Sequence, residues 1–181
     1  MNVKLYRLHF GKKGFSLVEV LVSVAISSFV LLAILGFVFW MNVTNLKTKA
    51  NANTLENARR ILDVIAYEIK GAENVYSPTT GAAQLSLKTL RHLPLDEDVT
   101  FIDFFLCGAD STDICLKKES QVPVVLNAGN VAITSLSFSQ IANGANTSVK
   151  ISLTVENKNP TNETSQSSLV TLDSTVSLRS Y

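Results

Sequence analysis

The longest hydrophobic stretch of the chain lies close to its amino terminus. Between residues 15 and 41, 21 of 27 residues are apolar, and no charged residue occurs between Glu19 and Lys47. As a helix, the uncharged residues 20–46 would extend over ~40 Å, more than the ~30 Å hydrocarbon core of a bilayer. The pattern therefore predicts a membrane-spanning helix.

Beyond this stretch, apolar residues follow the spacing of an amphipathic helix. The positions that would share its buried face are Ala58, Ile61, Leu62, Ile65, Ile69 and Ala72. Gly71 and then Pro78 are typical of the end of a helix. We therefore expect one helix from Phe15 to about Tyr76, in which residues 42–76 are the amphipathic continuation.

After Pro78 the pattern changes to the alternation that is typical of β-strands. Turn signals rich in Asn, Asp, Gly and Pro separate six predicted strands: residues 84–90, 99–106, 122–126, 131–141, 147–156 and 168–178. The alternation slips in the middle of residues 131–141, which predicts a β-bulge there. An antiparallel sheet packed on the amphipathic helix would bury the apolar faces of both. This arrangement is an α+β head, which we expect over residues 77–181.

Composition adds limits on function. Hydrophobic residues make up 46% of the 181 residues and charged residues 17%, and the apolar amino-terminal stretch accounts for this imbalance. A net charge of +1 argues against a strongly basic nucleic-acid-binding protein. Two cysteines exclude a disulfide-dense small protein, and two histidines leave little for a histidine-based metal or catalytic site.

The amino end admits three interpretations. Residues 1–14 contain no acidic residue but four basic ones, Lys4, Arg7, Lys12 and Lys13. A cleaved secretory signal would have a hydrophobic region of only ~7–15 residues, and the apolar run is longer than that. A simple membrane anchor fits the length, but it gives no reason for Glu19, because a carboxylate inside a spanning helix costs ~2.5–3.5 kcal/mol.

The third interpretation gives Glu19 a partner. A cut between Gly14 and Phe15 would create a new amine, which could pair with Glu19 of a neighbouring copy. On electrostatics alone, an equally good alternative is that Glu19 extends toward the headgroups at the membrane surface.

The residues around this position resemble a known processing site. The stretch KKGFSLVEVLV, residues 12–22, closely resembles the processing site of type IV prepilins and type II secretion pseudopilins. In that family a short basic leader ends in glycine, the mature chain begins with phenylalanine, and a glutamate follows four residues later. The resemblance implies that prepilin peptidase cuts after Gly14 and N-methylates Phe15. It also implies that Glu19 pairs with the Phe15 amine of the adjacent subunit during assembly.

The resemblance further implies an architecture and a role. Residues 1–14 would be the cleaved leader, residues 15–41 the transmembrane and filament-core helix, and the rest a pilin fold. The protein would be a structural subunit without enzymatic activity, in a type IV pilus or a type II secretion pseudopilus. The paired segments 149–156 and 170–179 are loosely similar to the larger minor pilins and the J-type pseudopilins, which favours a minor subunit.

The same resemblance predicts location and partners. We expect a single pass through the cytoplasmic membrane, with the amino terminus in the cytoplasm and the head outside, followed by entry into the filament. The partners would be the bilayer before assembly, prepilin peptidase, the inner-membrane assembly platform and other pilin or pseudopilin subunits. The alternative is a membrane-anchored extracytoplasmic binding protein or enzyme that does not enter a filament.

Cys107 and Cys115 are the main candidates for covalent chemistry in the head. They enclose seven residues between two strand-like runs. An exported head would meet oxidising conditions, so we expect a disulfide, which in a loop-entropy estimate would stabilise the head by ~2–3 kcal/mol. The alternative is two free cysteines buried as small hydrophobic residues.

Other candidate sites are weaker. We expect no cofactor; calcium at Asp96, Glu97 and Asp98, or at Asp110 and Asp113, is an alternative, but the spacing of an EF-hand is absent. His92 lacks a nucleophile in a recognisable motif and is not expected to be catalytic. Without its leader, the chain would carry 12 basic and 15 acidic residues, a formal charge of −3, which argues against binding of nucleic acid.

Overall fold

A computed structural model describes residues 14–76, 80–91, 93, 95–143, 146–158 and 167–179. The leader residues before Gly14 and, in the head, His92 lie outside this part of the chain. By its internal contacts the chain divides into two compact units, residues 1–42 and 43–181. Helix α1, Leu17–Gly71, contributes residues to both units.

The helical part of the first unit is exposed along its whole described length. Every described residue from Gly14 to Lys49 is exposed, including large apolar side chains such as Phe29 and Leu32. Helix α1 contains an 18-residue window with a mean hydropathy of 2.6 and no buried residue. By length and composition it is therefore long and apolar enough to cross a membrane.

Helix α1 ends at Gly71, five residues before the expected end. The next residues form strand β1, Ala72–Val75, which pairs with strand β3, Leu85–Thr89. The hydroxyl of Thr89 donates a hydrogen bond to the Gly71 carbonyl at 3.2 Å, which satisfies one of the free carbonyls at the helix end. A Cβ at Gly71 would lie 2.3 Å from the Arg91 guanidinium, so a larger residue there would displace the end of the Arg91 side chain. The helix ends where the strand pairing begins.

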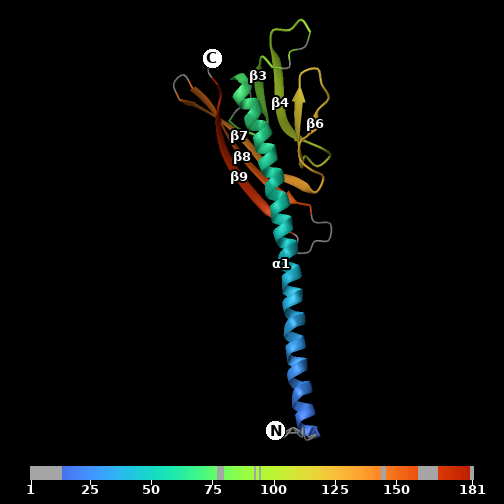
Figure 1. The fold of residues 1–181 in the computed structure, drawn as a ribbon. Helices are drawn as coiled ribbons and strands as arrows, with labels where there is room; N and C mark the ends of the chain where they lie inside the picture. Colours follow the sequence, from blue (N-terminus) through green and yellow to red (C-terminus); the bar gives the residue numbers. More distant parts are fainter. Residues whose placement is uncertain are drawn as a thin grey trace, which may run out of the picture. The chain divides into compact units, whose positions relative to one another are not determined.

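The strands form two antiparallel sheets, whereas the pattern alone predicts a single sheet. The first sheet has the order β1-β3-β4-β5-β6, and its remaining strands are β4, Thr100–Cys107, β5, Asp113–Lys118, and β6, Val124–Val125. The second has the order β2-β7-β8-β9, with β2, Thr80–Ala82, β7, Val131–Asn143, β8, Asn146–Asn157, and β9, Leu169–Ser177. The helix and the antiparallel sheets together confirm the expected α+β fold (Figure 1).

Two local expectations are confirmed in the second sheet. The register between β7 and β8 shifts between Ile133 and Ser135, at the bulge predicted from the slip in alternation. Strands β8 and β9 pair along their length, from Ser148 opposite Ser177 to Glu156 opposite Leu169. Strands β1 and β2, by contrast, are not indicated by the pattern, because they have only four and three residues.

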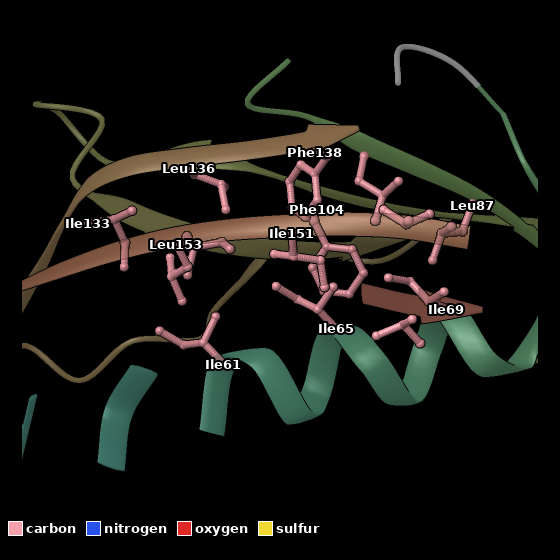
Figure 2. Packing of buried hydrophobic residues seen from close by; sticks show 14 of the residues in the cluster. Ile61, Ile65, Ile69, Leu87, Phe104, Ile133, Leu136, Phe138, Ile151 and Leu153 are labelled. Atoms are coloured by element: carbon pink, nitrogen blue, oxygen red, sulfur yellow. The ribbon is translucent and has the colours of Figure 1, made fainter. Parts of the chain in front are cut away.

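The core lies between the second part of α1 and both sheets. Ile61, Ile65 and Ile69 project from one face of the helix, as their spacing predicts, and are almost completely buried. Figure 2 shows them facing side chains from both sheets, among them Leu87, Phe104, Ile133, Leu136, Phe138, Ile151 and Leu153. The head therefore has one continuous hydrophobic core to which the helix contributes one wall.

Candidate functional site

The motif at the amino end lies at the start of α1. Gly14, Phe15 and Ser16 precede the helix, which begins at Leu17. The Phe15 side chain is 79% exposed, and no atom lies within 4 Å of the position that a Cβ at Gly14 would take. The peptide bond between Gly14 and Phe15 is thus open to an external protein.

Ser16 caps the helix. Its Oγ accepts a hydrogen bond from the backbone N–H of Glu19 at 3.3 Å, the geometry of an N-terminal cap. Glu19 occupies the third helical position, so Ser16-Leu17-Val18-Glu19 has the S-x-x-E sequence of a capping box. This pattern is local and visible in the sequence.

The cap changes the account of Glu19. A carboxylate in the first turn is stabilised by the positive end of the helix dipole, so Glu19 already has a favourable local environment in the single chain. Its side chain is exposed. A partner on another molecule is therefore not needed to keep Glu19 at this position, although the carboxylate remains accessible to one.

An apolar groove lies beside the same turn. Phe15, Leu17, Val20, Leu21 and Val24 line an open groove of about 520 Å³, and Glu19 does not line it. The apolar and the acidic parts of the first turns thus occupy different sides of the helix.

The polar side chains farther along the apolar stretch are satisfied within the helix. The hydroxyls of Ser23, Ser27 and Ser28 donate hydrogen bonds of 2.6–2.9 Å to carbonyls three or four residues earlier. Because these hydroxyls need no water, this part of α1 suits apolar surroundings, either lipid or neighbouring helices.

Comparison with known families favours one interpretation of this segment. Residues 10–35 match the family model of the prokaryotic N-terminal methylation motif. The match supports a type IV pilin-like prepilin. It includes Gly14, Phe15 and Glu19 and the first part of the apolar helix. No curated protein and no solved structure matches the chain.

The methylation motif carries general consequences. It implies processing by prepilin peptidase and association with other pilin subunits, and it suggests a structural role. Together with the apolar part of α1, it fits a membrane-anchored protein. The motif covers only the amino end, so it leaves the head unassigned.

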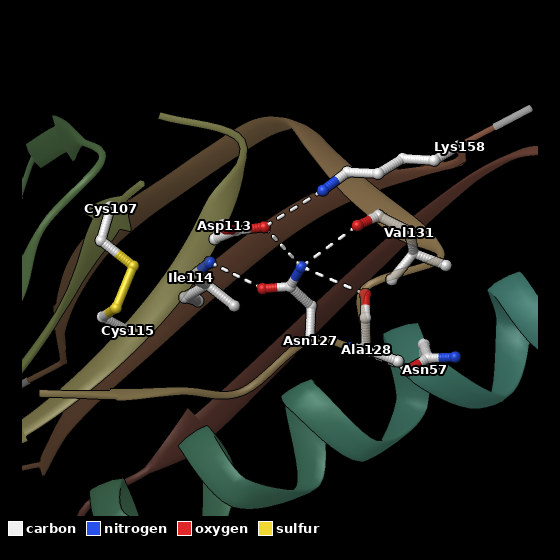
Figure 3. Close-up of polar contacts among 9 residues, drawn as sticks. All are labelled: Asn57, Cys107, Asp113, Ile114, Cys115, Asn127, Ala128, Val131 and Lys158. Carbon is white, nitrogen blue, oxygen red and sulfur yellow. Dashed lines mark hydrogen bonds and ion pairs between the residues drawn. A yellow bond between two sulfur atoms is a disulfide. The ribbon is translucent and has the colours of Figure 1, made fainter. Parts of the chain in front are cut away.

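In the head, Cys107 and Cys115 form a disulfide, with their Cα atoms 5.9 Å apart. Cys107 is the last residue of β4 and Cys115 lies in β5, so the bond crosses two neighbouring strands (Figure 3). Gly108 follows with φ of +85°, and a Cβ there would lie 3.0 Å from an oxygen of Asp113. Glycine is therefore needed at the start of this loop.

Beside the disulfide, the buried side chain of Asn127 connects several segments (Figure 3). Its Oδ1 accepts the N–H of Ile114 at 3.0 Å, and its Nδ2 donates to Asp113 at 2.9 Å and to the carbonyl of Val131 at 3.1 Å. The next residue, Ala128, donates its N–H to Asn57 of α1 at 3.3 Å. The Asn127 amide thus links β5 and β7, and the backbone of the next residue links the same loop to the helix, a role that local sequence patterns do not indicate.

Asp113 belongs to this structural network. The hydrogen bond from Asn127 holds the pKa of Asp113 below its usual value; Lys158, 3.5 Å away, acts in the same direction, and partial burial acts against both. Among the described residues, no three His, Cys, Asp or Glu side chains form a group that could hold a metal ion.

Proposed function

We propose that this chain is a minor pilin or minor pseudopilin, cut between Gly14 and Phe15 and N-methylated at Phe15. It then assembles into, or at the tip of, a type IV pilus or a type II secretion pseudopilus. The observation that carries the proposal is the methylation motif at the start of a long apolar helix whose residues up to Lys49 are exposed.

The exposed helix supports this proposal energetically. Large apolar side chains from Leu17 to Met41 are about half to four-fifths exposed. Soluble proteins rarely expose apolar surface on this scale, so this surface requires lipid or other helices. In our proposal residues 15–41 cross the cytoplasmic membrane first, and then exchange lipid for the helices of neighbouring subunits.

Glu19 would determine the axial position of the subunit. After cleavage, the new amine of Phe15 provides a positive charge near the start of each helix. Pairing this amine with Glu19 of the adjacent subunit would avoid an unpaired charge in the dry centre of the filament. The Ser16 cap starts the helix just before Glu19, which places the Glu19 carboxylate in the first turn.

The head would remain outside the membrane. In this proposal residues 77–181 and the amphipathic residues 42–76 form the extracytoplasmic part, and the leader stays in the cytoplasm. Export is consistent with the disulfide between Cys107 and Cys115.

Processing is the direct test. The full chain would be produced in its native host, or in a bacterium that carries prepilin peptidase, and analysed by intact mass and amino-terminal sequencing. We expect a chain that begins with methylated Phe15. Gly14→Val should remain uncut, whereas Gly36→Ala, a matched change at a glycine with equally open surroundings, should be cut normally.

Other outcomes would contradict the proposal. A retained Met1, or a cut at another position, would support the alternative of an anchored extracytoplasmic binding protein or enzyme. Cleavage without entry into filaments, measured by fractionation of sheared filaments, would contradict the assembly role while leaving the processing role in place.

A further inference from the structure

The first sheet has a groove on the face that points away from the core. Alternation along β3 and β4 directs Leu85, Leu87, Ile102 and Phe104 into the core. The intervening residues therefore lie on the opposite face. An open groove of about 590 Å³ lies there, lined by Tyr76, Gln84, Ser86, Phe101 and Asp103.

Two aromatic rings form one side of this groove. The rings of Tyr76 and Phe101 lie with their centroids 5.2 Å apart at an angle of 57°. Tyr76 is nevertheless 62% exposed. Its backbone N–H donates to the carbonyl of Ser86 at 2.8 Å, which ties Tyr76 to the sheet. The groove thus presents an exposed aromatic surface on a fixed backbone.

Hydrogen-bonding groups form the other side. The hydroxyl of Ser86, a buried residue, donates to Oδ1 of Asp103 at 2.5 Å and orients this carboxylate. The amide of Gln84 lies 3.5 Å from the same hydroxyl. A carboxylate has about four acceptor sites, so Asp103 retains capacity for a ligand, and the Gln84 amide offers both a donor and an acceptor.

The charged residues around the groove already have partners. Lys88 forms an ion pair with Glu73 at 2.9 Å. Asp103 lies directly opposite Lys117 of β5 in the strand register, so a basic residue on the same face accompanies the acid. A third acid, Glu119, accepts the backbone N–H of Phe101 at 3.0 Å. An anionic ligand would therefore find no excess of positive charge, and a cationic ligand would find only carboxylates that are already engaged. A neutral ligand with one apolar face and a hydroxyl-bearing rim matches the groove better.

We propose that this groove binds a sugar ring of a neutral polysaccharide. The C–H face of a pyranose would pack on the ring of Tyr76, and its hydroxyls would bind Asp103 and Gln84. This binding role is separate from assembly. It rests on the proposed function in one respect only: an extracytoplasmic head would expose the groove to polysaccharides outside the membrane.

Binding is measured on the full chain in nanodiscs of phosphatidylethanolamine and phosphatidylglycerol, because glycoside detergents would compete. The probes are chitotetraose, cellotetraose and maltotetraose, observed by saturation-transfer NMR up to about 10 mM, the range of weak single-site affinities. We expect saturable binding of at least one of them. Tyr76→Ala should weaken it about tenfold or more, and Asp103→Asn should weaken it measurably.

Tyr67→Ala is the matched control, since Tyr67 is 63% exposed but lies on α1, away from the lining residues. It should leave binding unchanged. Absence of saturable binding, binding that Tyr76→Ala leaves intact, or a preference for choline over all three sugars would overturn the proposal. The purified chain binds or fails to bind irrespective of cleavage after Gly14, so this outcome is separate from that of the processing test.

Discussion

The ammonium of Lys118 in β5 lies 3.6 Å from Oε1 of Glu68 in the last turns of α1. The two side chains differ in access to water: that of Glu68 is 6% exposed and that of Lys118 is 21% exposed. The second carboxylate oxygen of Glu68 is buried and has no hydrogen-bond partner. The pair therefore joins the helix to the first sheet, and the Glu68 carboxylate in it has little contact with water.

This asymmetry predicts unequal effects of mutation. Lys118→Met should lower the free energy of unfolding by about 1–3 kcal/mol, because it leaves a buried carboxylate unpaired. Glu68→Gln should cost less, because Lys118 can turn toward water. Urea unfolding of the full chain, followed by circular dichroism, measures both. Equal losses of unfolding free energy, or a larger loss for Glu68→Gln, would contradict the idea that the burial of Glu68 makes the loss of its partner the more costly change.

The second prediction separates the two roles of Glu19. The backbone N–H of residue 19 still donates to Ser16 Oγ in any variant of Glu19, so the cap remains. Glu19→Gln removes the charge but keeps a side chain that can form hydrogen bonds, as in a capping box, whereas Glu19→Ala removes both. We expect both variants to be cleaved after Gly14 and both to enter filaments poorly, as measured by immunoblotting of sheared filaments.

The comparison between these variants is informative. If Glu19→Gln assembles like the wild type while Glu19→Ala does not, hydrogen bonding by the side chain, and not its charge and pairing with the Phe15 amine, explains the role of Glu19. Glu56→Gln, at an exposed acid of the same helix beyond the apolar stretch, is the matched control and should assemble normally.

The third prediction concerns acid stability. The pKa of Asp113 is lower in the folded chain than its usual value, mainly because of Asn127. A lowered pKa stabilises the fold above the pKa of the unfolded chain, about 3.9, and this contribution is lost as the pH falls through the folded pKa. Between about pH 5 and pH 2, the wild type should therefore lose more unfolding free energy than Asp113→Asn.

Lys158→Met provides a graded comparison. It removes the smaller of the two favourable influences on Asp113, so the acid-dependent loss should fall between that of the wild type and that of Asp113→Asn. Urea midpoints at several pH values give these differences. The same pH dependence in all three proteins would contradict a stabilising role of the Asp113 carboxylate.

Periodicity was sufficient to predict the elements that bury long, regular faces. The spacing of Ile61, Ile65 and Ile69 indicated the buried side of the helix, and the slip near Ile133 indicated the bulge. The predicted helix end, about Tyr76, lies five residues beyond the observed end at Gly71. The end depends on the neighbours of Gly71, Thr89 and Arg91, which are distant in the sequence.

Other features depend on the register of strands, which periodicity does not specify. The division into two sheets rests on long-range pairings, and the linking role of Asn127 requires β5 and β7 to meet at its side chain, with α1 beside Ala128. The groove around Asp103 likewise needs Ser86 and Asp103 to be cross-strand neighbours. By contrast, the capping box of Ser16 and Glu19 is local and could have been found from the sequence.

The last prediction uses the only tryptophan of the chain as a probe of depth. Trp40 lies near the end of the apolar stretch, with its ring 6.2 Å from that of Phe37, and tryptophan prefers the headgroup region of a bilayer. If residues 15–41 span the membrane, lipids brominated near the headgroup should quench Trp40 fluorescence more strongly than lipids brominated near the chain ends.

A matched variant tests the geometry of the same span. In a Trp40→Phe background, Leu31→Trp places the probe nine positions earlier, ~13 Å along the helix axis. Its fluorescence should show the opposite preference, with deep bromines quenching more strongly, because residue 31 would lie well inside the hydrocarbon. Similar quenching profiles for the two probes would mean that the helix lies along the membrane surface, and residues 15–41 would then not be a transmembrane segment.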